Sequence, residues 1–277
     1  MNLVVASPTG MCFGVRRAIE QLEGALAQYG SIYALGSPIH NPHEVKRLEG
    51  MGLKVVEDIS QIPEGAAAFI RAHGVSRLEL EEAGRKCGVV VDGTCPFVRN
   101  VQHKAEYLQK EGYGVVIVGD SSHPEVKGIL GHVGGNALVI TGDEDVKIDG
   151  RQSKIGILCQ TTQREDALAS VASKFVFNTD EVRVYNTVCR ATIERQASMK
   201  RLAESVDGII VIGGRNSANT RELVGISESL GAPTLWVERA EELDRRWLQG
   251  RKNIGVAAGG STPDWLLNEL ICKLKRL

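Results

Sequence analysis

Three segments of this chain follow the same course, and this internal repeat restricts the possible folds more than any other feature. Each segment starts at a cysteine, continues with apolar residues at helical spacing, and then has a short buried strand that ends at a glycine. The interval from cysteine to glycine is 24 residues in every case: Cys12 to Gly36, Cys95 to Gly119, and Cys189 to Gly213. Equal intervals with the same order of elements predict three copies of one α/β unit.

Each copy continues through a helix and further strands. The predicted second strands are 53–56, 137–140 and 233–237, and the third strands begin at Ala67, Ile155 and Ile254 and run into polar exits. A fourth strand closes the first two copies and leads to the next cysteine. The third copy has no such strand after its final helix, so we expect residues 3–6 to complete its sheet.

Alternating strands and helices predict small parallel sheets that are covered on both faces, with the polar strand exits at one edge. We therefore expect an α/β fold of three similar units, arranged as a pseudo-threefold trefoil around a central metal site. The first unit would span residues 13–95 and the second 96–188. The third would span 189–277 plus 1–12, closed by the N-terminal strand.

Charge and the amino terminus limit the class of protein. The 277 residues carry 33 Lys and Arg against 34 Asp and Glu, a net charge of −1. This balance offers no basic excess for nucleic acid or for an acidic membrane surface. The first residues lack the segments of a signal peptide, and no apolar run reaches spanning length. We expect a cytoplasmic protein with no nucleic acid and no membrane as partner.

The six cysteines divide into two groups. A structural role as small buried apolar residues is expected for three of them: Cys87, Cys159 and Cys272. The other three, Cys12, Cys95 and Cys189, each lie between a strand and a helix amino terminus, which favours a thiolate. Three thiolates could ligate zinc with an open position, or an iron–sulfur cluster with one iron not ligated by protein. Packing of three helix starts without a metal is a third interpretation.

Polar residues at the strand exits form a second candidate set. The set contains three histidines, two serines and an asparagine: His40, His73, His123, Ser217, Asn219 and Ser261. Such donors beside helix amino termini suit a phosphate or a diphosphate. The chain has no Walker loop and no Gly-x-Gly-x-x-Gly motif, so a nucleoside triphosphate or a dinucleotide is disfavoured.

Glu125 is the one carboxylate that lies in a strand exit beside a member of this polar set, two residues after His123. It is either a functional group or a first-turn glutamate that complements the helix dipole. Thr161 and Thr162 follow a third strand and could cap the next helix. These residues alone leave both interpretations open.

Nine short motifs together resemble the 4-hydroxy-3-methylbut-2-enyl diphosphate reductase family, over essentially the whole chain. They are Ser7-Pro8-Thr9-Gly10-Met11-Cys12-Phe13-Gly14-Val15, Ile39-His40-Asn41, Arg71-Ala72-His73-Gly74, Asp92-Gly93-Thr94-Cys95-Pro96, His123-Pro124-Glu125, Gln160-Thr161-Thr162, Thr187-Val188-Cys189-Arg190-Ala191-Thr192, Asn216-Ser217-Ala218-Asn219-Thr220 and Gly260-Ser261-Thr262-Pro263. The resemblance implies an iron–sulfur oxidoreductase of isoprene biosynthesis, at the last step of the methylerythritol phosphate (non-mevalonate) pathway.

The resemblance also implies the site residues. A [4Fe–4S] cluster with one iron not ligated by protein would be held by Cys12, Cys95 and Cys189. The diphosphate substrate would be bound by His40, His73, His123, Ser217, Asn219 and Ser261. Glu125 would handle the proton together with Thr161, which also contacts the substrate. The family often has serine where this chain has Ala218, so only a backbone N–H is carried over there. The implied electron donor is a ferredoxin or a flavodoxin.

The implied reaction is the reductive dehydroxylation of 4-hydroxy-3-methylbut-2-enyl diphosphate to isopentenyl diphosphate and dimethylallyl diphosphate. An open iron can bind the allylic hydroxyl as a Lewis acid, and a nearby carboxylic acid can protonate that oxygen so that it leaves as water. One alternative is a zinc-dependent hydrolase or isomerase of a phosphorylated metabolite. Another is a solute-binding protein, which the lack of a signal peptide disfavours.

Overall fold

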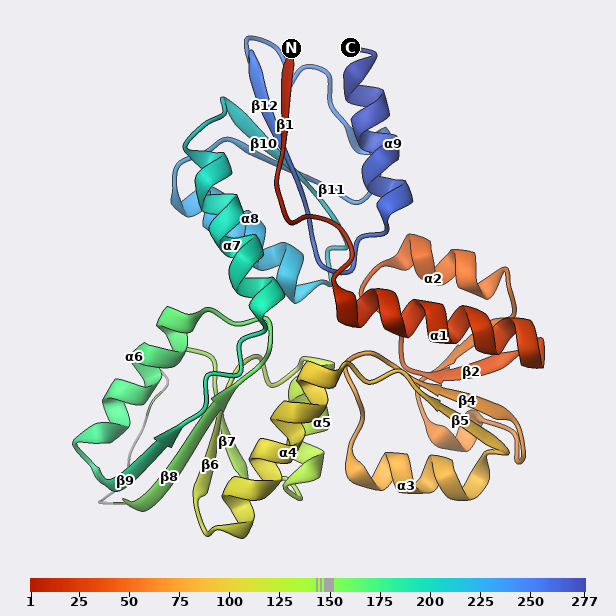
Figure 1. Ribbon diagram of the computed structural model, residues 1–277, viewed down its shortest axis with the longest axis vertical. Coiled ribbons are helices and arrows are strands. Elements are labelled where there is room, and N and C mark those ends of the chain that lie inside the picture. The colour runs from red at the N-terminus through yellow and green to blue at the C-terminus, as the bar shows by residue number, and fades with distance from the viewer. Residues whose placement is uncertain (143, 145, 147–151) are drawn as a thin grey trace. The chain divides into compact units, whose positions relative to one another are not determined.

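A computed structural model describes residues 1–142, 144, 146 and 152–277. Three four-stranded parallel sheets, flanked by helices, make up the architecture (Figure 1). The chain divides into two compact lobes. The smaller lobe consists of Met1–Arg16, Ile39–Arg47 and Arg190–Leu277, and the larger lobe consists of Arg17–Pro38 and Leu48–Cys189.

The sheet of the smaller lobe joins the first strand of the chain to three strands from its last third. In spatial order they are β1 (Asn2–Val5), β12 (Asn253–Ala258), β10 (Gly208–Ile212) and β11 (Thr234–Val237). The helices of this lobe are α7 (Arg190–Ala203), α8 (Ala218–Ser229), α9 (Asp264–Lys275) and the short η3 (Ala240–Glu242). Val4 in β1 pairs with Gly255 in β12, so the first strand of the chain is the fourth strand of this sheet.

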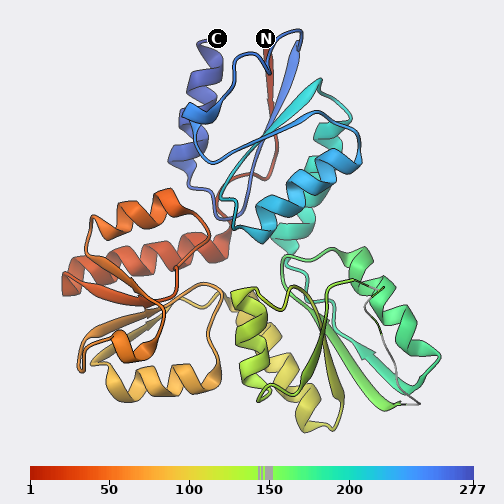
Figure 2. The same ribbon diagram turned by 180° about the vertical axis from the view of Figure 1, so that it is seen from behind.

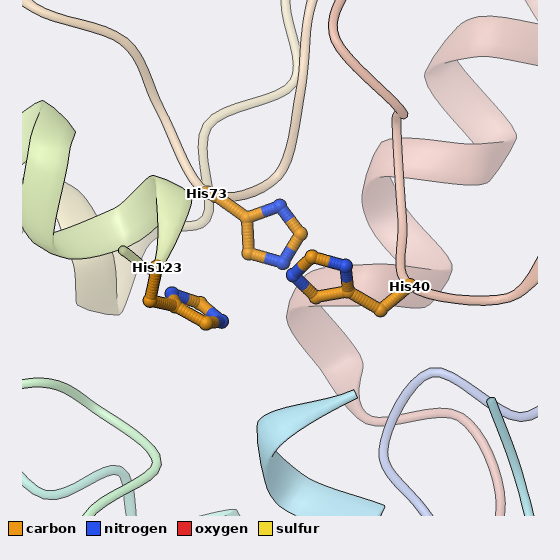
Figure 3. A group of neighbouring side chains, drawn as sticks. All are labelled: His40, His73 and His123. Carbon is orange, nitrogen blue, oxygen red and sulfur yellow. The ribbon is translucent and has the colours of Figure 1, made fainter. Parts of the chain in front are cut away.

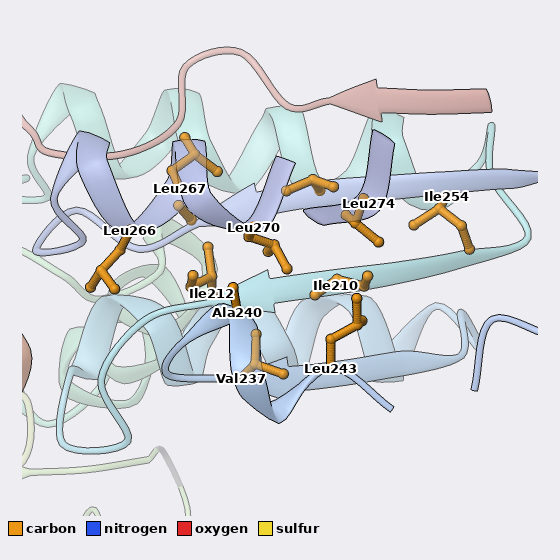
Figure 4. Packing of buried hydrophobic residues seen from close by; sticks show 12 residues of the cluster. Ile210, Ile212, Val237, Ala240, Leu243, Ile254, Leu266, Leu267, Leu270 and Leu274 are labelled. Carbon is orange, nitrogen blue, oxygen red and sulfur yellow. The ribbon is translucent and has the colours of Figure 1, made fainter. Parts of the chain in front are cut away.

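Helix α9 packs on this sheet through a stripe of leucines. Leu266, Leu270 and Leu274 recur every four residues and are at most 2% exposed. They belong to the same core cluster as Ile210 and Ile254 of the sheet (Figure 4). Burying each leucine contributes roughly 1.5–3 kcal/mol to folding. This stripe therefore holds the last helix of the chain on the sheet that its first strand completes, and both chain ends lie on this lobe (Figure 2).

Two sheets make up the core of the larger lobe. The strands of the first are β3 (Leu53–Val56), β2 (Ile32–Leu35), β4 (Ala67–Ile70) and β5 (Val89–Asp92), in spatial order. The strands of the second are β7 (Ala137–Ile140), β6 (Gly114–Val118), β8 (Gln152–Cys159) and β9 (Thr179–Val184).

The helices that accompany these two sheets alternate with their strands along the chain. The helices of the first sheet are α1 (Phe13–Tyr29), α2 (Pro42–Glu49), the short η1 (Ile59–Gln61) and α3 (Arg77–Lys86). Both α1 and α2 include residues of each lobe. With the second sheet come α4 (Pro96–Lys110), α5 (Pro124–His132) and α6 (Glu165–Val176). In the part of the chain that is described, no helix combines the length and the apolar character that crossing a membrane requires.

All three sheets have the same strand order. In each, the strand that follows the cysteine-led helix lies between the second and the third strand, and the fourth strand lies outside the third. This common topology confirms the α/β fold of three similar units with small parallel sheets. The unit boundaries at residues 95 and 188, and the threefold arrangement, stay predictions.

Within the larger lobe, helices α3 and α5 approach closely. Gly131 makes this approach possible, because a Cβ added there would overlap the side chain of Ser76, the N-cap residue of α3. Gly128, one turn earlier, faces the backbone carbonyl of His73. This packing brings the exit of β4 next to the start of α5.

One structural cysteine was predicted wrongly. Cys159 is buried, as expected, and Cys87 is half-buried, but Cys272 is exposed. The apolar stripe of α9 passes through Leu270 and Leu274, and Cys272 lies midway between them in sequence, which turns it to the opposite face of the helix.

Candidate active site

The three repeat cysteines lie at equivalent corners, and one backbone hydrogen bond defines each corner. Every cysteine N–H donates to the carbonyl oxygen of the second residue after the end of the third strand. These bonds run from Cys12 to Gly260, from Cys95 to Ala72, and from Cys189 to Thr161, and each measures 2.9 Å. The fourth-strand exit is thereby tied to the third-strand exit in each unit.

Each corner also starts a helix: α1, α4 and α7 begin one residue after their cysteines. None of the three cysteines forms a disulfide, and all three are partly buried; the Cys95 side chain makes no capping hydrogen bond although Cys95 is the N-cap residue of α4. A helix amino terminus stabilises a thiolate, and thiolates are the ligands that iron–sulfur clusters and zinc prefer. The donor set of these corners therefore fits either kind of centre.

In the larger lobe, Glu125 and Thr161 form a buried pair. Glu125 lies in the first turn of α5 and is 2% exposed. Its Oε1 accepts a hydrogen bond from the Thr161 N–H at 2.6 Å, and its Oε2 accepts one from the Thr161 hydroxyl at 2.8 Å. Because the Thr161 carbonyl binds the Cys189 N–H, one threonine links the carboxyl group to a cysteine corner.

The environment of Glu125 changes its acidity. Burial raises the pKa of the Glu125 carboxyl to about 7, although the backbone and side-chain hydrogen bonds from Thr161 act in the opposite direction. Desolvation prevails because the charged form loses its water inside the protein. At neutral pH the group is therefore divided between carboxylic acid and carboxylate, which is the condition for a general acid.

Two of the exit histidines also meet in the larger lobe. His123 caps α5, since its Nδ1 accepts a hydrogen bond from the Glu125 N–H at 3.1 Å. With Nδ1 in use as an acceptor, the proton of the neutral ring lies on Nε2. The rings of His73 and His123 meet edge to face, with centroids 5.4 Å apart (Figure 3). His40, also labelled there, belongs to the smaller lobe.

The smaller lobe carries the other polar exits. Ser217 caps α8, and the hydroxyl of Ser261 lies 3.3 Å from that of Ser217 and 3.1 Å from the carbonyl oxygen of His40. The Oδ1 of Asn219 accepts a hydrogen bond from the Gly260 N–H at 3.1 Å, which orients the amide group of Asn219. The carbonyl oxygen of Gly260 also accepts the hydrogen bond from the Cys12 N–H, so Gly260 has the same role at this corner as Thr161 has at the Cys189 corner.

The predicted site residues thus fall into two groups. The larger lobe brings together the residues around two corners: His73, Cys95, His123, Glu125, Thr161 and Cys189. The smaller lobe brings together those around one corner: Cys12, His40, Ser217, Asn219 and Ser261. Each group lies at the strand exits of its own sheets.

Comparison with known proteins connects this geometry to a family. The family model for the LytB protein matches residues 3–275. The chain belongs to the LytB protein family. Curated relatives named 4-hydroxy-3-methylbut-2-enyl diphosphate reductase include those of Geobacter sp. (strain M21), 46% identical over 100% of this chain and 98% of the relative, and of Geobacter sulfurreducens, 44% identical over 99% and 97%.

Solved structures of LytB-type reductases share the fold. One is the structure of (E)-4-hydroxy-3-methyl-but-2-enyl diphosphate reductase, described as the terminal enzyme of the non-mevalonate pathway; it is 38% identical, with a TM-score of 0.75, over 100% of this chain and 99% of that one. Another is the Plasmodium falciparum E-1-hydroxy-2-methyl-but-2-enyl-4-diphosphate reductase, 26% identical with a TM-score of 0.91 over 99% and 88%.

The structure of this LytB family member adds two residues that sequence reasoning missed. The Thr187 hydroxyl accepts a hydrogen bond from the Cys159 N–H at 2.8 Å and donates to the Cys159 carbonyl oxygen at 2.6 Å. The Thr9 hydroxyl does the corresponding work in the smaller lobe, where it accepts from the Ala258 N–H at 2.7 Å. Cys159 and Ala258 both end a third strand, so each threonine secures a cysteine-bearing loop to that strand.

A signal for these residues exists in the sequence. Thr9 precedes Cys12 by three residues and Thr187 precedes Cys189 by two, and each pair lies within one of the nine family motifs. The repeat also shows that three site residues of different types occupy equivalent positions. Each lies four residues after the strand-ending glycine of its own unit: His40, His123 and Ser217. Glu125 and Asn219 both lie two residues further on.

Proposed function

We propose that this chain is a 4-hydroxy-3-methylbut-2-enyl diphosphate reductase. It would remove the allylic hydroxyl of its substrate reductively, giving isopentenyl diphosphate and dimethylallyl diphosphate at the end of the non-mevalonate pathway. Membership of the LytB family supports this reaction. The observation that carries the proposal is the buried Glu125–Thr161 pair, hydrogen-bonded to the Cys189 corner.

In this proposal Cys12, Cys95 and Cys189 hold a [4Fe–4S] cluster with one iron not ligated by protein. The equivalent corners, the cysteines that form no disulfide and the adjoining helix starts support that assignment. When bound, such a cluster supplies electrons and a Lewis-acidic iron. The protein's part is to hold three thiolates on backbone that is fixed by one hydrogen bond per corner.

Glu125 supplies the proton that the leaving hydroxyl needs. In its carboxylic acid form, the Oε2–H can donate to the Thr161 hydroxyl oxygen, and the Thr161 O–H can then donate onward to the substrate oxygen. The 2.8 Å separation between Glu125 Oε2 and Thr161 Oγ1 permits this transfer. The hydroxyl leaves as water because it departs already protonated.

The diphosphate is bound by side-chain and backbone hydrogen-bond donors in this proposal. His123 offers its Nε2–H, since Nδ1 is used in the cap of α5. The other donors are the side chains of His40, His73, Ser217, Asn219 and Ser261, together with the backbone N–H of Ala218. Fixing one end of the substrate orients its reacting end, and such positioning contributes several kcal/mol to catalysis.

Anaerobic purification tests the proposal. We expect a brown protein with about four iron and four sulfide per chain, as a [4Fe–4S] centre requires. With reduced methyl viologen as the electron source, it should convert 4-hydroxy-3-methylbut-2-enyl diphosphate to both products, which mass spectrometry can identify. A colourless protein that contains zinc and hydrolyses or isomerises a phosphorylated metabolite would contradict the proposal. In the cell, a ferredoxin or flavodoxin would replace the viologen.

A further inference from the structure

A cluster of aromatic and basic side chains borders α4 and the second sheet of the larger lobe. We call it the α4–β9 face. Its members in contact with one another are Lys104, Tyr107, Tyr113, Lys154, Glu181, Arg183 and Tyr185. Phe97 is included because it lies seven residues before Lys104 on α4, a spacing that places both on the same side of the helix. They come from α4, from the residue before β6, from β8, and from β9 and the residue after it.

Contacts between cations and rings hold this face together. The Lys104 ammonium lies 4.7 Å from the centroid of the Tyr185 ring. The Arg183 guanidinium lies 4.7 Å from the centroid of Tyr113 and 6.0 Å from that of Tyr107. Contacts of this kind order long side chains that would otherwise sample many rotamers. The cations are therefore held in place on the surface.

Positive charge prevails in this set. Its three cations meet one carboxylate, that of Glu181, which lies 3.4 Å from Arg183 and 3.9 Å from Lys154 and also accepts a hydrogen bond from the Tyr113 hydroxyl. The whole chain, by contrast, has a net charge of −1. A local basic excess on a nearly neutral protein favours an acidic partner at this place.

The face is also accessible and aromatic. Phe97 is 43% and Tyr107 44% exposed, and the Lys154 and Arg183 side chains are 47% and 36% exposed. Exposed aromatic rings with arginine among them are typical of protein interfaces, and redox complexes use small interfaces of this kind. If these side chains only covered the second sheet, neither an exposed phenylalanine nor an excess of cations would be needed.

The position of this face relates it to two of the corners. Phe97 follows Cys95 by two residues, on the first turn of α4. Tyr185 precedes Cys189 by four residues, and its N–H extends the pairing of β9 with β8 by donating to Ile157. A protein bound at this end of the face would lie close to two of the proposed cluster ligands.

We propose that the α4–β9 face is the docking surface for a small acidic electron-carrier protein. This inference rests on the proposed function. Removal of the substrate hydroxyl as water consumes two electrons and two protons: the C–O bond breaks, one proton leaves with the oxygen, and the other forms the new C–H bond. A one-electron carrier must therefore bind twice per turnover, is oxidised each time, and must dissociate readily.

Steady-state kinetics with two electron sources tests the docking surface. The protein source is a reduced plant-type [2Fe–2S] ferredoxin, which is acidic, and the small source is reduced methyl viologen. The variants are Lys104→Glu and Phe97→Ala, with Lys174→Glu, an exposed lysine on α6, as the matched charge control. Each is assayed at low and at high ionic strength, because salt screens exposed charges.

We expect Lys104→Glu to lower kcat/KM for ferredoxin by about tenfold at low salt, with a smaller loss at high salt. Phe97→Ala should lower it at both salt concentrations. Rates with methyl viologen, and both rates of Lys174→Glu, should match those of the unchanged protein. Equal losses with both electron sources, or no loss with ferredoxin, would overturn the docking surface while leaving the reductase intact. Failure of the unchanged protein with methyl viologen would instead count against the proposed function.

Discussion

At the scale of single residues, Glu125 shows how position decides chemistry. A first-turn glutamate on an exposed helix would be ionised at neutral pH and would serve the helix dipole. Here burial raises its pKa to about 7, and Thr161 donates one hydrogen bond to each oxygen of its carboxyl group. The same residue type thus becomes a proton donor through its surroundings.

Replacement of this carboxyl group is the most direct test of its role. Glu125→Gln keeps the size of the side chain, and its amide can still accept from the Thr161 N–H. We expect the iron content and the KM to stay near those of the unchanged protein, while kcat falls by roughly 10²–10⁴, the usual contribution of a general acid. Glu125→Asp, which retains an acid on a shorter chain, is the matched control. Full activity of Glu125→Gln would remove Glu125 from the mechanism.

The pH dependence follows from the direction of the shift. The acid form is active, so kcat/KM should fall as pH rises through about 7, the pKa of Glu125. In Thr161→Val, one of the hydrogen bonds that lowers this pKa is lost, so the alkaline limb should move to higher pH while the maximal rate falls because the relay hydroxyl is gone. Thr161→Ser should restore both. A limb that stays in place in Thr161→Val would show that another group titrates.

At the scale of elements, hydroxyl groups secure the loops that carry the cysteines. Thr187 satisfies both backbone groups of Cys159 at the end of β8, and Thr9 satisfies the Ala258 N–H at the end of β12. Both contacts lie just beyond the last ladder hydrogen bond of a parallel pair. They continue the pairing where the chain turns toward the next helix.

Loss of the Thr187 hydroxyl should therefore act on stability and on the metal centre together. Thr187→Val leaves the buried Cys159 N–H and C=O without this partner, which costs about 1–3 kcal/mol. We expect a lower unfolding temperature and less iron per chain after anaerobic purification. Thr187→Ser keeps the hydroxyl and should lie close to the unchanged protein in both measurements. Normal iron content in Thr187→Val would show that the Cys189 loop is held by other contacts.

At the scale of the whole chain, β1 has a special place, because it joins the start of the sequence to a sheet made from its end. Leu3 contacts the cluster that contains the α9 leucines, and Val4 contacts the cluster on the side of α7 and α8. Successive residues of β1 therefore pack against clusters on opposite faces of the sheet. Val5 is 40% exposed.

This alternation predicts a large difference between neighbouring substitutions. Val4→Asp places a carboxylate against an apolar cluster and should reduce the free energy of unfolding by about 2–4 kcal/mol. Val5→Asp, in the same strand but exposed, should change it by less than about 1 kcal/mol. Thermal unfolding of the two variants side by side measures the difference. Similar losses in both would mean that β1 is held by its backbone pairing rather than by its side chains.

The sequence by itself determined the repeated α/β units, their strands and the cysteine corners, because these depend on local periodicity and on intervals along the chain. It also singled out the site residues, through strand exits and through the family resemblance. The acidity of Glu125, by contrast, depends first on its burial and then on the opposing hydrogen bonds from Thr161, 36 residues away. The outward direction of Cys272 depends on which face of α9 the sheet covers, and the α4–β9 face depends on side chains from separate segments of the chain. Only the tertiary structure could decide these, because burial, pairing and charge environment arise from contacts between segments that the order of residues does not bring together.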